Sequence, residues 1–260
     1  MFDLILAAAA AAPVAASKPE FGLLPALEQG GPVSWATFAI LVIQSVGSFF
    51  ILFSKYFEQR KIMNQYARVR ASFWNNNSLA EGAAKLEKDT PYRQIVDDGL
   101  RAAEQHSQLI DQQDQHDWTY TVMSRTRVAI ENKLRSGMSF LASVASTAPF
   151  IGLFGTVVGI LAALIKISAA GQASLDTVAG PVGEALIMTA IGLAVAVPAV
   201  LAYNWLQARN QEISNQLVSF VNDVQAYMGS NGAVRPSVVR AAAAKATTPA
   251  AKPVTAPAKA

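Results

Sequence analysis

Three side chains at or inside apolar parts of the chain have the chemistry to handle protons: Thr156, Thr189 and Glu184. A threonine hydroxyl both donates and accepts hydrogen bonds, so each threonine places a polar group in a dry helix interface or beside a pore. Acids in membranes are costly and usually functional, so Glu184 is a candidate for an ion path. Two plainer alternatives stay open. A threonine can bond only its own helix backbone, and Glu184 can be an interfacial charge at the outer end of a span.

The two threonines lie within stripes of small residues. The uncharged run 137–165 has 29 residues, and a second, 185–208, has 24. Spacings of four and three place each stripe on one helix face, where small side chains let helices approach closely in lipid. The stripes are Ala145, Pro149, Gly152, Thr156, Gly159 and Ala163 in the first run, and Ala185, Thr189, Gly192, Ala196 and Ala199 in the second. We expect helix packing from Gly152, Gly155, Gly159, Gly192, Ala196, Pro149 and Pro198.

The composition indicates a membrane protein. Of the 260 residues, 52% are hydrophobic and only 15% are charged, against about a quarter in soluble domains. A third apolar stretch, Val33–Phe53, is also long enough to cross a bilayer. The prediction is an all-α integral membrane protein with three transmembrane helices at 33–54, 137–167 and 180–207, two of them extended into a cytoplasmic helical domain.

Basic residues near the spans predict the orientation. They follow the first span, precede the second and follow the third, at Lys55, Arg60, Lys61, Arg125, Arg127, Lys133, Arg135 and Arg209. Because cytoplasmic loops are enriched in Lys and Arg, residues 55–136 and the helix 208–228 are placed in the cytoplasm. A lead 1–32 and a loop 168–179 are placed in the periplasm. Alternatively, Met1–Ser17 is a segment that weakly resembles a signal peptide.

The cytoplasmic segments are expected to be helical, followed by a disordered tail. Apolar residues recur at a spacing of four, which predicts an amphipathic helix running straight into the second span: Trp118, Val122, Thr126, Ile130 and Leu134. Residues 55–136 are too few and too charged for a large core of their own, so we expect helical extensions of the spans to pack there. Residues 229–260 contain 11 alanines, 4 prolines, five Lys or Arg and no acid, which predicts a disordered basic tail.

Several other chemistries are disfavoured. The chain has no cysteine, no catalytic arrangement of Ser and His, and no Lys-Ser or Lys-Thr after Gly152, Gly155 and Gly159 for a phosphate loop. We expect no enzyme activity, cofactor, metal or nucleic-acid partner. No acid, base or histidine lies in the middle of a span, so a proton path would need a carboxylate from another protein.

Two motifs resemble the MotA/TolQ/ExbB proton-channel family. STAPFIGLFGTVVGI at 146–160 is similar to its second span. GPVGEALIMTAIGL at 180–193, continued by VPAV at 197–200 and by Tyr203-Asn204, is similar to its third. The start of the first motif and the long lead look more like the ExbB branch than the TolQ branch. Val158 replaces a common tryptophan, and Gly183 a common alanine, which bears on the branch more than on the function.

The resemblance implies a homopentamer around a central pore in the bacterial inner membrane. The pore would hold a dimer of an ExbD-like single-span protein that carries the mid-membrane aspartate. Proton flow would drive motion that a TonB-like protein passes to outer-membrane transporters. Thr156 and Thr189 would line the pore, and Glu184 would be the family's third-span glutamate. A TolQ-type motor for envelope maintenance and a passive membrane scaffold are the alternatives.

Overall fold

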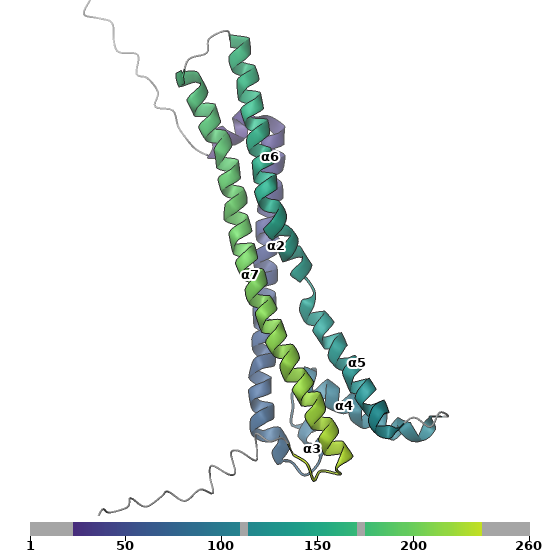
Figure 1. Cartoon of the computed structure of the whole chain (residues 1–260). Helices are drawn as coiled ribbons and strands as arrows, with labels where there is room; N and C mark the ends of the chain where they lie inside the picture. Colours follow the sequence, from purple (N-terminus) through teal and green to yellow (C-terminus); the bar gives the residue numbers. More distant parts are fainter. Residues whose placement is uncertain (1–22, 110–113, 171–174, 236–260) are drawn as a thin grey trace, which may run out of the picture. The chain divides into compact units, whose positions relative to one another are not determined.

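The computed structural model describes residues 23–109, 114–170 and 175–235, and these residues form helices and no strand (Figure 1). The predicted all-α fold is therefore confirmed. The elements are α2 (Leu23–Ser72), η2 (Phe73–Asn75), α3 (Leu79–Ala84), α4 (Pro91–Gln105), η3 (His106–Gln108), α5 (Gln115–Arg135), α6 (Met138–Ala170) and α7 (Leu175–Gly229).

Three helical stretches of the described chain are long and apolar enough to cross a membrane, at Gly31–Asn75, Gln115–Ala169 and Ala185–Gly229. The helices extend beyond the predicted spans. Helix α2 begins at Leu23 within the expected lead, with a kink at Gly31, whose φ of 65° is not helical, before Pro32. Helices α6 and α7 both extend into 168–179, the expected periplasmic loop.

The prediction that the amphipathic helix runs straight into the second span is wrong. Helix α5 ends at Arg135 and α6 begins at Met138. Between them Gly137 has a φ of +81°, a left-handed conformation that glycine adopts without strain. The carbonyl of Lys133 accepts from the Ser136 backbone N–H and hydroxyl, and from the Lys55 ammonium at 2.9 Å. In a continuous helix the Lys133 carbonyl would accept a hydrogen bond from the backbone N–H of Gly137. Here these other donors satisfy it.

The chain divides into two compact units. Among the described residues, the apolar unit comprises 23–49, 141–170 and 175–200, and the polar unit comprises 50–109, 114–140 and 201–235. The core of the apolar unit is small and comes from α2, α6 and α7. Its buried members are Leu41, Val144, Ala148, Val195, Ala196 and Ala199.

The polar unit has a larger core than residues 55–136 could build alone. The expected packing of helical extensions explains it, since α2 and α7 both contribute to the cluster. Its buried members include Val69, Phe73 and Trp74, Tyr92, Ile95 and Val96, Met123 and Leu134, and Ile213, Leu217 and Phe220. Local caps fix the short helices: Ser78 caps α3, Thr90 caps α4 ahead of Pro91, and Asp114 caps α5.

Candidate functional site

The two candidate threonines meet in the apolar unit. Thr156 of α6 and Thr189 of α7 place their Oγ1 atoms 2.5 Å apart, a short hydrogen bond in which either hydroxyl can donate. Thr156 is only 4% exposed, and Thr189 is half-buried. The pair therefore has a deep member and a member nearer the surface of the unit.

Thr156 has more acceptors within reach than protons to give. Its Oγ1 lies 3.0 Å from the carbonyl oxygen of Ala185 and 3.2 Å from that of Gly152, besides the Thr189 hydroxyl. A hydroxyl carries one proton. When Thr156 donates to a backbone carbonyl, Thr189 must donate to Thr156. When Thr156 donates to Thr189, the Thr189 proton is free to point elsewhere. The pair thus has two hydrogen-bonding arrangements.

Glycines bring the two helices close enough for this contact. A Cβ on Gly152 would lie 2.7 Å from the carbonyl oxygen of Met188 and 3.0 Å from the Cα of Gly192. A Cβ on Gly192 would lie 2.7 Å from the carbonyl oxygen of Ala148. About two turns away, a Cβ on Gly159 would lie 3.1 Å from that of Ala185. Because the obstacles at Gly152 and Gly192 are backbone atoms, larger residues there would separate the helices.

Ala196, Pro149 and Pro198 were also predicted to pack helices, and the structure describes their burial. Ala196 is buried in the core of the apolar unit. Pro149 and Pro198 are half-buried inside α6 and α7, where each lacks the N–H that a helix normally donates to the residue four before it. At each proline one backbone hydrogen bond of the helix is missing, close in sequence to Gly152 and Gly192.

Helix α2 contributes residues for which the sequence analysis assigned no role. Thr37 is buried, donates its hydroxyl to the carbonyl of Val33 at 2.8 Å, and has its methyl group 3.0 Å from where a Cβ on Gly155 would lie. Ser34, Thr37, Leu41, Gln44 and Ser48 recur at spacings of three and four, which was the available signal. Within the described part of the chain, Gln44 Oε1 and Ser48 Oγ are buried without a hydrogen-bond partner.

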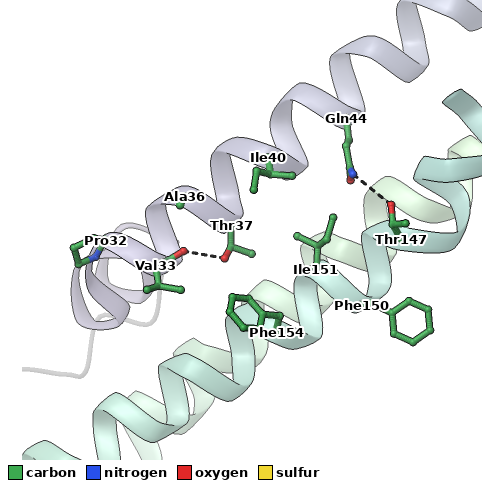
Figure 2. Close-up of a pocket in the computed structure, with 10 residues that line it drawn as sticks. All are labelled: Pro32, Val33, Ala36, Thr37, Ile40, Gln44, Thr147, Phe150, Ile151 and Phe154. Atoms are coloured by element: carbon green, nitrogen blue, oxygen red, sulfur yellow. Dashed lines mark hydrogen bonds between the residues drawn. The ribbon is translucent and has the colours of Figure 1, made fainter.

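An apolar groove of about 780 Å³ lies between α2 and α6, with Gln44 and Thr147 as its polar contact (Figure 2). The Gln44 amide donates to the Thr147 hydroxyl at 3.4 Å, a long bond. Phe150 and Phe154 on its rim are largely exposed. The groove has the chemistry of a hydrocarbon-facing surface and holds no titratable group.

Glu184 lies in α7, but its side chain is outside those that the structure describes. Helix α7 begins at Leu175, so Pro181 is inside the helix and does not start it. Glu184 therefore stands in the tenth position of the helix. Whether its carboxylate faces an ion path stays a prediction.

Comparison with known proteins gives the family. The family model for the MotA/TolQ/ExbB proton channel family matches residues 87–219. The chain is 35% identical over 213 residues to the biopolymer transport protein ExbB of Xanthomonas campestris, covering 78% of this chain and 84% of the relative.

Two further relatives carry the names of both branches. ExbB of Neisseria meningitidis is 32% identical over 203 residues, or 76% of this chain and 92% of that protein. The Tol-Pal system protein TolQ of Pseudomonas aeruginosa is 34% identical over 197 residues, or 72% and 84%. The predicted resemblance is confirmed, and this chain belongs to the MotA/TolQ/ExbB proton channel family.

Proposed function

We propose that the chain is an ExbB-type subunit of a proton-driven motor in the bacterial inner membrane, and that the motor energises TonB-dependent outer-membrane transport. The subunit acts as a homopentamer around a dimer of an ExbD-like single-span protein, with its N-terminus in the periplasm and its C-terminus in the cytoplasm. The observation that carries the proposal is the hydroxyl pair of Thr156 and Thr189 within spans that have no charged residue at their centres.

The two arrangements of the pair match the two states of a partner's carboxyl group. With Thr156 donating to Thr189, the Thr189 proton is free to bond an ionised carboxylate. With Thr156 donating to the Ala185 carbonyl, Thr189 donates inward and its lone pairs accept from a protonated carboxylic acid. Thr189, the less buried of the two, is the group that meets the partner.

This exchange matters because an unpaired carboxylate is expensive in a medium of low dielectric constant. A carboxylate that reaches the pair accepts a hydrogen bond from the Thr189 hydroxyl, whereas a protonated acid can face an apolar surface at less cost. The protonation state then selects which neighbour the partner faces, and that selection is the two-state element that a motor needs. Proton release and uptake become coupled to movement.

The test is the double substitution Thr156→Val and Thr189→Val, which keeps the side-chain shape and removes both hydroxyls. We expect proton-driven uptake to be lost while native mass spectrometry still finds the pentamer with its single-span partner. Thr147→Val is the control on the same helix, because the exposed Thr147 hydroxyl donates to the Ser143 carbonyl of its own helix and, within the described residues, its only hydrogen bond with another helix is the long 3.4 Å bond that it accepts from Gln44. Normal uptake in the double variant would refute the proposal and favour a passive scaffold.

Two single substitutions refine the mechanism. Thr189→Val should impair uptake more than Thr156→Val, since only Thr189 presents its hydroxyl to the partner. Glu184→Gln should reduce uptake more than it reduces pentamer formation if the carboxylate belongs to the proton path. Uptake at the level of the unsubstituted chain would instead support an interfacial role for Glu184.

A TolQ-type motor for envelope maintenance is the second candidate, because the identity to the Pseudomonas aeruginosa TolQ, 34%, falls between those to the two ExbB relatives, 32% and 35%. Expression in two host strains, one lacking ExbB and one lacking TolQ, separates the two functions. Restored siderophore uptake supports the ExbB type, and restored envelope integrity without uptake supports the TolQ type.

A further inference from the structure

Two aromatic residues and two arginines form one surface of the polar unit, on α2 and α7. The rings of Tyr56 and Trp205 stack with centroids 5.6 Å apart. The guanidinium carbon of Arg209 lies 4.8 Å from the centroid of the Trp205 ring, a cation–π contact. Arg60 follows Tyr56 by four residues as Arg209 follows Trp205, so each helix presents an aromatic residue and then a cation on the same face.

The register of the two helices at this surface is fixed from inside. The buried Gln59 amide donates to the Leu206 carbonyl at 2.9 Å and to Asn210 Oδ1 at 2.8 Å. Met63 Sδ lies 2.8 Å from Nη2 of Arg209. These contacts hold α2 against α7 and fix the positions of the aromatic pair and Arg209, and Arg60 lies about one helical turn after Tyr56 on α2.

The two arginines lack the acidic partners that other cations of this unit have. Lys55 pairs with Glu58, Arg93 with Asp97 and Arg127 with Glu131. In the ranges that the structure describes, neither Arg60 nor Arg209 forms an ion pair, and the buried Nε of Arg209 has no hydrogen-bond partner. The Arg60 side chain is exposed and Arg209 is half-buried, so their terminal guanidinium N–H groups, not the buried Nε, are the donors open to an anion, and a guanidinium can bond two phosphate oxygens at once.

The position along the sequence places the site at the edge of the hydrocarbon. Residues 29–54 and 185–208 carry no charge, so Arg209 is the first charged residue after the third span and Arg60 follows closely on the first. Tyr and Trp prefer the membrane–water interface, where their amphipathic rings sit at headgroup level. On both helices the aromatic residue comes first and the arginine follows. Along a lipid, the acyl carbons and the glycerol likewise come before the charged headgroup.

We propose that Tyr56, Arg60, Trp205 and Arg209 form a binding site for an anionic glycerophospholipid of the adjoining leaflet. The lipid phosphate accepts hydrogen bonds from Arg209 and Arg60, and the glycerol and first acyl carbons lie on the stacked rings. A net-negative headgroup is favoured over a zwitterionic one because no acid offsets the two arginines. The site requires neither the proton path nor the choice between ExbB and TolQ.

The test uses the full-length chain, reconstituted in nanodiscs with equal amounts of phosphatidylglycerol and phosphatidylcholine and released for native mass spectrometry. We expect the chain to retain phosphatidylglycerol in preference to phosphatidylcholine by at least fivefold. An interfacial cation contributes about fivefold, equivalent to about 1 kcal/mol, so the double variant Arg60→Gln and Arg209→Gln should bind the two lipids almost equally. Arg125→Gln, an exposed cation on α5, is the matched control and should keep the preference.

The conservative pair Arg60→Lys and Arg209→Lys separates charge from folding, and should retain part of the preference. The same spectra report the subunit number. The proposal is overturned if the unsubstituted chain retains both lipids equally, or if the glutamine variant keeps its preference. It is also overturned if the unsubstituted oligomer holds no phosphatidylglycerol and the glutamine variant loses subunits, since the arginines would then bind a neighbouring copy.

Discussion

Gly152→Ala should separate α6 from α7 at the threonine pair. The new methyl group would lie 2.7 Å from the Met188 carbonyl oxygen, 3.0 Å from the Gly192 Cα and 3.2 Å from the Thr189 Cα. An ordinary carbon–oxygen contact is about 3.3 Å or more, so the helices must move apart by roughly 0.5 Å. Backbone atoms cannot rotate aside as a side-chain tip can. Overpacking of this kind costs about 1–3 kcal/mol.

The separation also acts on the hydrogen bond. Adding roughly 0.5 Å to the 2.5 Å distance between the Thr156 and Thr189 Oγ1 atoms weakens the bond without breaking it. The variant should therefore melt several degrees lower in detergent and show reduced, not abolished, proton-driven uptake. Gly192→Ala should behave alike, because its methyl group would meet the Ala148 carbonyl oxygen at 2.7 Å.

Thermal unfolding followed by circular dichroism measures the first effect, with Gly229→Ala as the control. A Cβ at Gly229 has its nearest neighbour, His116 Cδ2, at 3.5 Å, an ordinary contact. Equal melting temperatures for Gly152→Ala and Gly229→Ala would show that the two spans do not approach as closely as the structure has them. The hydrogen bond between Thr156 and Thr189 would then lack the close helix contact that it requires.

Three further outcomes are expected in the polar unit, each measured as a melting temperature. Lys55→Met should lower stability by about 1–3 kcal/mol, since it removes the ion pair to Glu58 and the donor to the Lys133 carbonyl from a site where Lys55 is 9% exposed. Gly137→Ala should cost about 1–2 kcal/mol, because a φ of +81° strains any residue with a Cβ; an unchanged melting temperature would contradict that conformation. Burial raises the pKa of Asp223, so the folded chain holds its proton to higher pH than the unfolded chain, and stability falls as pH rises through that window. Asp223→Asn should therefore be stabilising at pH 7, with the gain shrinking as pH falls towards the ordinary aspartate pKa.

The contact between α6 and α7 could be predicted from sequence because its signal is periodic. Small residues at spacings of four and three are informative in lipid, where close packing is the main force between helices. Gly152 and Gly192 belong to those stripes, and the structure places them against each other's backbone. The same stripes contain Thr156 and Thr189, and their hydroxyls do meet.

The break between α5 and α6 could not be predicted in this way. Its causes are a positive φ at Gly137 and donors that lie far away in sequence, namely Lys55 to the Lys133 carbonyl and Asn210 to the Leu134 carbonyl. Periodicity reports which face of a helix is apolar, but not where a distant side chain caps its last carbonyls. The burial of Thr37 against Gly155 could not be predicted for a related reason, because the length and hydropathy of the first span do not say which of its few polar residues face another helix.

The hydroxyl pair also explains how spans without a charged residue at their centres could serve proton transfer. A fixed charge in a span would bind one protonation state of a partner and repel or ignore the other. Two threonines with one proton each and a spare carbonyl at Ala185 can present either a donor or an acceptor by rotating two hydroxyl groups. Such rotations move no heavy atom, so the close glycine packing that holds the pair does not oppose the exchange. Spans with two hydroxyl groups and no charge at their centres are therefore suited to follow the charge of a partner that would carry the acid itself.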